Sequence, residues 1–369
     1  MITSSGKMNT SQAIYAFFAG VCFIIMFAYS EIAIQCARNA LALCAKIIIP
    51  SLYPFVIISE IIVHSGLGDI IGKPLNKIFN KLFGISSPSV CAVILGALCG
   101  FPIGTKVVLS LLDSGSIDKS EAEHLISFCN NPSSSFLINI VGISLYSRST
   151  VGVILYCATL ANSALIGIIF NKIKPVKKNE HGYYSRNILS NTSIVTSAVS
   201  NSIPSILSIC SYIIFFSVIM GCIEKIMSYI HLPKVLAVCV YGLIEMTGGV
   251  THSAALGNNF FGLCLTAFFI GWSGLSVHCQ MISLCNRYDL SLKKYFISKA
   301  LLGFFNSLSV SLIYHINPFL FSPNQSAVST IYFPDLYDAW AKLCSLLFAI
   351  AIAIYIFRIK HKSTICIIY

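Results

Sequence analysis

Residues 87–112 read SPSVCAVILGALCGFPIGTKVVLSLL and decide the fold, because this run is uncharged over its whole length except at Lys106. A helix needs about 20 apolar residues to cross a bilayer. The run is long enough, yet its centre is Gly100-Phe101-Pro102-Ile103-Gly104. Proline removes a backbone donor and glycine weakens a helix. The run therefore predicts two short helices joined by a break at membrane depth.

The composition places this run in a polytopic membrane protein. The chain has 369 residues, of which 56% are hydrophobic and 10% charged, and its mean hydropathy is +0.82. A soluble domain carries about 25% charged residues, so a cytosolic enzyme and a disordered chain are excluded. The net charge is +11, but the basic residues lie in short loops between apolar runs, which argues against nucleic acid as a partner. The 15 cysteines contain no C-x-x-C pair and are expected to be buried free thiols.

Ten apolar runs are candidates for crossing the membrane, and the first of them is expected to be a retained helix rather than a cleaved signal peptide. The runs cover 13–30, 40–64, 87–112, 125–146, 150–171, 200–223, 233–251, 258–280, 299–321 and 339–357.

Four of these runs are interrupted, and the interruptions form two pairs. Besides the break in 87–112, they are Asn130-Asn131-Pro132-Ser133-Ser134-Ser135, Glu245-Met246-Thr247-Gly248-Gly249 and Gly271-Trp272-Ser273-Gly274. The two pairs occur in the same order in the two halves of the chain. Paired interruptions of this kind mark the binding sites of transporters built from internal repeats.

The distribution of basic residues indicates how the interrupted runs cross. If all ten runs span, 9 loop Lys and Arg lie inside and 14 outside, against the positive-inside rule. If 87–112 and 233–251 are re-entrant hairpins, the balance becomes 17 inside, with Lys299 among them, and 6 outside. The second arrangement satisfies the rule, makes the two halves inverted repeats and places both termini in the cytoplasm.

The segment 72–83 separates the first repeat helix from its hairpin. Lys73, Lys77 and Lys81 recur every fourth residue opposite apolar side chains. This pattern predicts a short amphipathic helix in the cytoplasmic interface of the membrane. The alternative is a solvated helix within a loop.

The expected fold is therefore all-α, with about eight spanning helices and two re-entrant hairpins. Its central part consists of two repeats, each made of a helix, a hairpin, a broken helix and a further helix. The expected regions are an N-terminal helix (1–39), a first repeat (40–171), a basic cytoplasmic linker (172–198), a second, inverted repeat (199–321), and a C-terminal helix with a basic tail (322–369).

Four motifs carry a resemblance to known families over about residues 40–321. The architecture resembles the nucleoside recognition, or Gate, domain shared with concentrative nucleoside transporters. The motifs are more closely similar to YlbJ-type sporulation integral membrane proteins of endospore-forming bacteria. They are Pro50-Ser-Leu-Tyr-Pro-Phe55, Gly100-Phe-Pro-Ile-Gly104, Ser127-Phe-Cys-Asn-Asn-Pro132 and Gly271-Trp-Ser-Gly-Leu-Ser-Val-His-Cys-Gln280.

This resemblance implies a multi-pass protein of the bacterial cell membrane that binds or translocates a small polar solute by alternating access and contributes to formation of the spore cortex. Nucleoside transporters carry a Gln-Thr-Glu cluster at the first hairpin tip, where this chain has Gly-Phe-Pro-Ile-Gly. Nucleosides, other small metabolites and cortex precursors therefore all stay open as solutes. The alternative function is a membrane scaffold that recruits partners. Expected partners are the lipid bilayer, the solute, and further copies of the chain or other sporulation proteins.

Ionisable residues at membrane depth are functional candidates, because an isolated charge there costs about 2.5 to 3.5 kcal/mol on insertion scales. Glu245 is the one acidic residue expected near the midplane, either as a ligand for a cation, a proton or a solute amine, or as a structural carboxylate. Lys106 follows the first tip at the spacing at which His252 follows the second. Lys106 either flanks the solute or pairs with Glu245. His252 and His278 either carry protons or form helix contacts.

Polar groups at the breaks complete the candidate binding site. The Asn130–Ser135 segment offers amides, hydroxyls and freed carbonyls for a neutral solute or a partly dehydrated cation, or else hydrogen bonds between helices. Trp272 either stacks on a planar solute or packs in the core. No cofactor or metal is expected, and Na⁺ or H⁺ would couple transport. The candidate solute-binding residues are Gly100, Pro102, Gly104, Thr105, Lys106, Asn130, Asn131, Ser133, Ser134, Glu245, Thr247, Gly248, Trp272, Ser273, Ser276 and His278.

An enzymatic function is not expected. Gly66-Leu67-Gly68-Asp69 matches the Gly-x-Gly-Asp of intramembrane aspartyl proteases. That chemistry needs two carboxylates that share a site, and the other aspartates lie in loops or at the ends of runs. No zinc-protease motif, phosphate-binding loop or serine–histidine pair is present.

Overall fold

The computed structural model describes residues 10–176, 191–230, 232–257 and 260–321, and this part of the chain is helical throughout, with no strand. Five of its helices are long and apolar enough to cross a membrane, and they cover Ser30–Ser65, Ser149–Ile173, Ile194–Tyr229, Phe260–Tyr288 and Lys293–Ile316. Large apolar side chains such as Phe27 (79% exposed) and Ile316 (83%) cover the outside of the molecule. These features are those of an all-α, multi-pass membrane protein.

The chain begins with α1 (Thr10–Ala28) and a long helix made of α2 (Ser30–Leu43), the π-helical segment η1 (Cys44–Ile48) and α3 (Ile49–Ser65). The helix expected over 40–64 thus begins ten residues earlier. Glu31 and Arg38 do not interrupt it, because both lie on its exposed side.

Two short helices follow, α4 (Leu67–Gly72) and α5 (Asn76–Phe83). The helix expected within 72–83 is therefore present. Lys77, Lys81, Ile78 and Leu82 are exposed on α5, whereas Phe83 is buried and stacks on Phe128. Basic and apolar side chains lie together on its outer surface, the pattern of a helix at a membrane interface.

The decisive run forms two helices of 11 residues, α6 (Ser89–Cys99) and α7 (Ile103–Asp113), separated at 100–102. Each is about 16 Å long, which is too short to cross a bilayer of about 30 Å. The two helices pack closely where Gly96 meets Gly104. Every residue of α7 from Ile103 to Leu111 is buried, so α7 contacts protein on all sides.

The expected broken helix consists of α8 (Lys119–Phe128) and η2 (Phe136–Leu145), which is π-helical. The backbone between them is unwound over 129–133, and helical structure resumes at Ser134. The uninterrupted helix α9 (Ser149–Ile173) follows.

The second half passes through the same order of elements. The long helix α10 (Asn191–Tyr229) precedes the short helices α11 (Lys234–Ile244) and α12 (Met246–Ala254). An interrupted helix follows as α13 (Phe260–Trp272) and α14 (Gly274–Cys285), and then come η3 (Asn286–Tyr288), α15 (Lys293–Ile316) and η4 (Pro318–Leu320).

The breaks of the second half are narrower than expected. Between α11 and α12 only Glu245 leaves the helical conformation, so the expected break over Glu245–Gly249 is wrong for the four residues from Met246 to Gly249. The Glu245 carboxylate explains this, because it caps the first turn of α12 and lets the helix restart at once. The break between α13 and α14 lies at Ser273, which has a φ of 73°.

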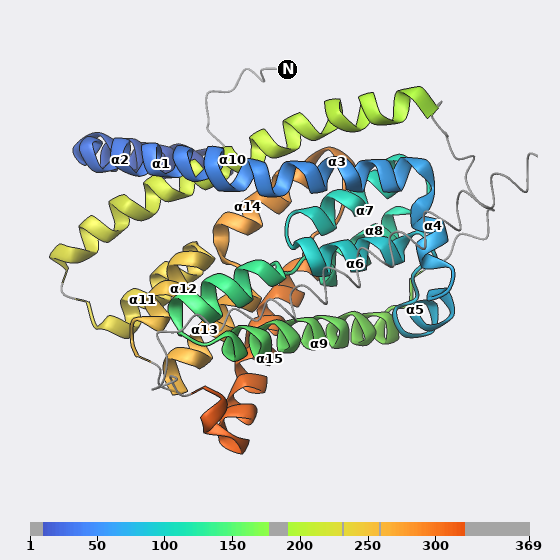
Figure 1. Cartoon of the computed structure of the whole chain (residues 1–369). Helices are drawn as coiled ribbons and strands as arrows, with labels where there is room; N and C mark the ends of the chain where they lie inside the picture. The colour runs from blue at the N-terminus through green and yellow to red at the C-terminus, as the bar shows by residue number, and fades with distance from the viewer. Residues whose placement is uncertain (1–9, 177–190, 231, 258–259, 322–369) are drawn as a thin grey trace, which may run out of the picture.

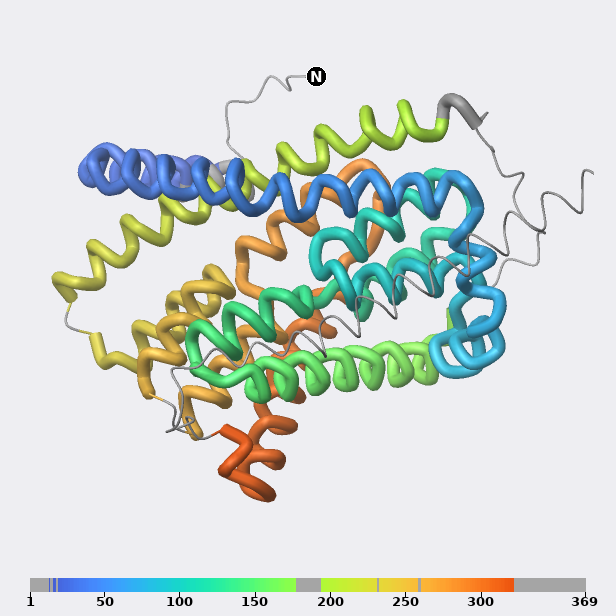
Figure 2. The backbone as a smooth tube through the Cα atoms, viewed as in Figure 1, coloured from blue at the N-terminus to red at the C-terminus, as the bar shows by residue number. Residues whose placement is uncertain are grey.

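In space, α10 crosses α2 and α3 along one side of the molecule, while α9 runs along the opposite side and packs against η2 and α15 (Figures 1 and 2). The short helices α6, α7 and α8 lie between these sides (Figure 1). One large apolar cluster joins α3, α6, α7, α8, α14 and α15, and a second joins η2, α9, α11, α12, α13 and α15. The interrupted helices thus lie at the centre of the protein.

Five of the eight expected spans are therefore present by length and composition within the described residues. The run 125–146 is too polar in α8 and too short in η2 to count by length and composition, and α1 contributes a shorter apolar segment over Ala19–Ala28. The run 339–357 lies outside the described residues. The cysteines were expected to be buried free thiols. Those that the structure describes are all free, but six of them are only half-buried and Cys157 is exposed.

The close approach of α6 and α7 predicts that a single methyl group there destabilises the fold. A Cβ at Gly96 would overlap the carbonyl oxygen of Cys129, which is backbone and cannot move aside. We expect Gly96→Ala to lower the Tm of the detergent-purified protein by several degrees, since overpacking costs about 1 to 3 kcal/mol.

Gly248→Ala is the matched control. A Cβ at Gly248 would make only ordinary contacts, the nearest at 3.5 Å, and alanine favours a helix by about 1 kcal/mol over glycine. Its Tm should therefore be unchanged or higher. Equal Tm values for the two variants would contradict the packing described here.

Candidate functional site

The first hairpin tip lies against the first break. The Phe101 backbone N–H donates to the Asn131 carbonyl over 2.7 Å, and Gly100, with a φ of 78°, lies against the backbone of Ser133. Only glycine fits at position 100, because its backbone conformation disfavours a side chain and a Cβ would overlap Ser133. The tip thus satisfies backbone groups that the unwound segment leaves unpaired.

The second hairpin tip lies against the second break in a similar way. The Trp272 indole Nε1 donates to the Leu243 carbonyl over 3.1 Å. Gly274, which has a φ of 79°, lies against the backbone of Glu245 and Met246. Each tip is therefore docked on the interrupted helix of its own half. Phe101 of the first tip and Met246 of the second belong to the same apolar cluster.

Two asparagines of the first break are buried with unsatisfied side chains. Asn130 is 0% exposed and Asn131 3%. The Asn131 amide donates to the Phe128 carbonyl and to the Ser163 hydroxyl, each over 3.0 Å. Its Oδ1, and both polar atoms of the Asn130 side chain, have no hydrogen-bond partner among the described residues. Such groups are costly to bury, and they are the donors and acceptors that a polar solute would use.

A buried lysine contacts the same break. Lys299 of α15 is 1% exposed and its Nζ donates to the Asn130 carbonyl. The hydroxyl of Tyr295, one turn earlier, lies 3.0 Å from Nδ1 of His278 on α14. The His278 Nε2 has no hydrogen-bond partner in the described chain. We refer to Asn130, His278, Tyr295 and Lys299 as the Asn130 cluster.

The sequence identified only half of this cluster. Asn130 and His278 were expected site residues. Lys299 was counted as a charge in a cytoplasmic loop, which is wrong, because α15 begins at Lys293 and carries Lys299 into the interior. Tyr295 was not considered. A helical spacing of four residues from Tyr295 to Lys299 within an apolar stretch was the signal that could have found both.

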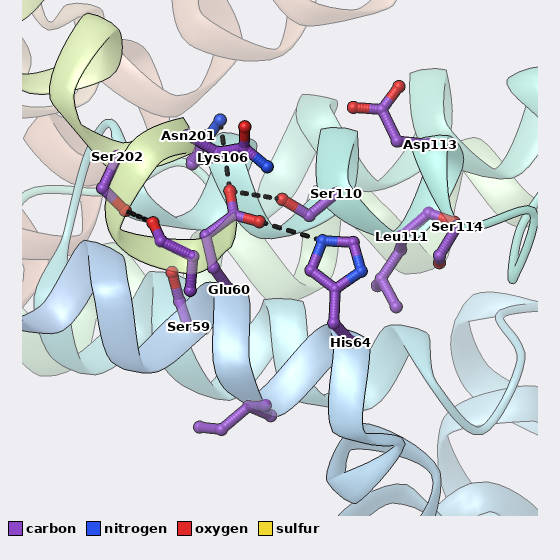
Figure 3. A network of polar contacts seen from close by, with 12 residues as sticks. Ser59, Glu60, His64, Lys106, Ser110, Leu111, Asp113, Ser114, Asn201 and Ser202 are labelled. Carbon is purple, nitrogen blue, oxygen red and sulfur yellow. Dashed lines mark hydrogen bonds and ion pairs between the residues drawn. The ribbon is translucent and has the colours of Figure 1, made fainter. Parts of the chain in front are cut away.

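A second buried polar group, shown in Figure 3, joins α3 to α7. Glu60 Oε1 lies 3.1 Å from Lys106 Nζ and accepts a hydrogen bond from the Ser110 hydroxyl over 2.8 Å. Glu60 Oε2 lies 3.2 Å from Nε2 of His64, one turn along α3. Glu60 is 2% exposed and Lys106 is 8% exposed. This ion pair fixes the second helix of the first hairpin to a long spanning helix.

The expected pairing of Lys106 with Glu245 is therefore wrong, because Lys106 pairs with the buried Glu60. Glu60 was overlooked within the apolar run 40–64, although Glu60 and His64 are separated by one helical turn. Glu245 instead accepts hydrogen bonds from the backbone N–H groups of Thr247 over 3.0 Å and Gly248 over 2.6 Å. It is the N-cap of α12.

The other expected site residues fall into three groups. Pro102, Gly104 and Thr105 are buried in the first hairpin, and Ser133 and Ser134 are half-buried beside it. Trp272 contacts the His278 ring edge to face, with centroids 4.5 Å apart. The rest lie around the second break, where Ser273 and Ser276 are buried, Gly248 is half-buried and Thr247 is exposed.

The arrangement brings both breaks and both tips to the centre of the protein but provides hydrogen-bonding groups rather than metal ligands. Within the described residues no three His, Cys, Asp or Glu side chains converge to hold a metal. The functional groups of the Asn130 cluster are one ammonium, one amide, one imidazole and one phenol. These groups bind polar molecules and carry protons.

The buried ion pair predicts that the effects of substituting Glu60 and Lys106 on the stability of the protein depend strongly on one another. Glu60→Gln leaves a buried ammonium without its carboxylate, which typically costs about 3 to 5 kcal/mol. The double variant Glu60→Gln/Lys106→Met removes both charges and should recover most of the lost Tm. The measurement is the Tm of the four proteins of this double-mutant cycle in detergent.

Lys119→Met is the control, because Lys119 and Asp289 form an exposed ion pair at 3.6 Å and exposed pairs contribute little. Its Tm should not change. If the Tm loss of the double variant equalled the sum of the losses of the two single variants, Glu60 and Lys106 would act independently.

Comparisons with known proteins identify one type of relative. The chain is 22% identical over 346 residues to the sporulation integral membrane protein YlbJ of Bacillus subtilis (strain 168), an alignment that covers 84% of this chain and 83% of the relative. No family model matches the chain, and no solved structure matches it. The chain is thus a multi-pass membrane protein that is similar, over most of its length, to an integral membrane protein of sporulation.

Proposed function

We propose that the protein binds a small polar solute at the two interrupted helices and carries it across the membrane of a sporulating bacterium. The observation that carries this proposal is the first break, where buried side-chain groups of Asn130 and Asn131 lack partners among the described residues. A scaffold has no need of such groups, since unsatisfied polar atoms in the interior reduce stability. A solute that bonds to them would compensate this cost.

An inverted repeat, as proposed from the charge distribution, is supported by matching contacts in the two halves. In the first half Lys106 of α7 pairs with Glu60 of the preceding long helix. In the second half His252 of α12 has its Nε2 3.9 Å from a carboxylate oxygen of Glu224, which lies on the preceding long helix α10. Both contacts join the second short helix to the long helix before it.

Matching glycines support the same proposal. Gly96 and Gly242, ten residues before Lys106 and His252, mark the points where the paired short helices touch. Each glycine also contacts the interrupted helix of its half, Gly96 at Cys129 and Gly242 at Phe269. We propose that the two hairpins enter from opposite sides of the membrane, as in the Gate-type fold that the sequence resembles.

This architecture suits alternating access. The breaks provide hinges in α8–η2 and α13–α14. Each tip is bonded to its break by one described hydrogen bond, from Phe101 to Asn131 in the first half and from Trp272 to Leu243 in the second. Movement of one hairpin away from its break would open the Asn130 cluster to one side of the membrane. Na⁺ or H⁺ would drive such a cycle. The name of the relative connects the function to sporulation, and we propose the cortex stage as the step served.

Transport predicts that proteoliposomes containing the protein accumulate at least one polar metabolite. The vesicles are incubated with a mixture of nucleosides, amino acids, organic acids and sugar phosphates, and their contents are measured by mass spectrometry against empty vesicles. Asn131→Leu removes an amide oxygen from the break and should abolish the accumulation. Asn139→Leu, at an exposed position on η2, should leave it intact. Contents equal to those of empty vesicles would favour the scaffold function instead.

The re-entrant hairpins predict the sides on which two loops lie. A topology reporter inserted between α12 and α13 should report the outside, and one inserted between η3 and α15 should report the cytoplasm, because only α13–α14 crosses between them. If the short helices α11 and α12 together crossed the membrane, both readings would be reversed.

A further inference from the structure

The Asn130 cluster contains a buried lysine with no carboxylate partner among the described residues. The Lys299 side chain is fully enclosed, and no carboxylate lies within ion-pair distance of it among the described residues. The other titratable groups at the cluster are the phenol of Tyr295, the imidazole of His278 and the thiols of Cys129, Cys279 and Cys285. None of these groups carries a negative charge at neutral pH in ordinary proteins. The Asn130 carbonyl and the Tyr295 ring, 5.9 Å from Nζ, offer only partial negative charge.

The contrast with Lys106 shows what is absent. Lys106, buried to a similar degree, has the Glu60 carboxylate 3.1 Å away. A buried charge is tolerated when it is paired and hydrogen-bonded. Lys299 has a hydrogen bond, to the Asn130 carbonyl, but it has no paired charge among the described residues. The missing partner is an anion.

The remaining unpaired groups of the cluster can donate to such an anion. The ammonium has two donors left after its bond to the Asn130 carbonyl. The Asn130 amide nitrogen lies near the Tyr295 hydroxyl, and its remaining donor capacity can be directed to an anion. When the Tyr295 hydroxyl donates to Nδ1 of His278, the imidazole proton lies on Nε2, which is the unpaired nitrogen.

We infer that the Asn130 cluster binds an oxyanion group of the solute, a carboxylate or a phosphate, with the Lys299 ammonium as its counter-charge and Asn130 and His278 as further donors. This inference rests on the proposed function and specifies its substrate class. It also requires movement, because Asn130, Tyr295, His278 and Lys299 are each at most 1% exposed. The solute enters when the first tip leaves the break at Asn131.

The test compares molecules that differ only in the anionic group. The detergent-purified protein is heated at constant ionic strength with matched pairs: uridine monophosphate and uridine, glycerol 3-phosphate and glycerol, succinate and succinamide. The anionic member of at least one pair should raise the Tm in a saturable way, and its neutral counterpart should not. The pair that responds distinguishes phosphate from carboxylate.

Lys299→Met should weaken the apparent affinity for that anion about tenfold or more. Lys293→Met removes the same charge from an exposed position on the same helix and should leave the affinity unchanged. His278→Phe, which keeps a ring but removes the Nε2 donor, should also weaken binding and serves if Lys299→Met does not fold. Stabilisation by neutral members that persists in Lys299→Met would overturn the inference and leave the proposed function standing. No shift from any compound would overturn both.

Discussion

The need to satisfy backbone polar groups inside a membrane governs this structure. A helix that breaks at membrane depth exposes N–H and C=O groups with no water to receive them. Here the hairpin tips and the breaks solve the problem for one another. The Phe101 N–H bonds to the Asn131 carbonyl, and the Leu243 carbonyl accepts from Trp272. Two interruptions that would be unstable alone become one packed centre, which brings polar side chains into the interior of the protein, where the proposed solute would bind.

Charge balance divides the interior into a structural and a functional part. Glu60 and Lys106 neutralise each other and join α3 to α7. Lys299 has no such partner within the described chain and lies against the unwound segment instead. Two lysines of similar burial therefore differ in whether a carboxylate lies beside them. A fold can retain an unneutralised charge of this kind when a ligand supplies the counter-charge for part of its working cycle.

Much of the fold could be predicted because its signals are local. Apolar length, the Gly100–Gly104 cluster and the Asn-Asn-Pro of the first break each act within one or two helical turns, and the elements occur in the expected order. The width of the second break was not predictable from its glycines. That width depends on the Glu245 carboxylate, which caps α12 and lets the helix begin at the next residue.

The polar partners were less predictable, because they depend on contacts between distant segments. Glu60 reaches Lys106 across 46 positions in sequence and Lys299 reaches Asn130 across 169. When hydropathy is averaged over a window, Glu60 is outweighed by the apolar residues around it. Lys299 is grouped with the preceding lysines and assigned to a loop. Only the packing of α3 on α7 and of α15 on α8 shows that both side chains face the interior.

The complete enclosure of α7 has a consequence for how the protein is made. With 11 residues, a lysine and no lipid-facing side from Ile103 to Leu111, α7 lacks the features by which the insertion machinery recognises a spanning segment. The surroundings of α7 in the folded protein are other helices of the same chain. Glu60 is synthesised before Lys106, so the carboxylate on α3 is in place when the lysine emerges. The ion pair can therefore form only after α7 has been synthesised, when the carboxylate on α3 is already present to receive the lysine.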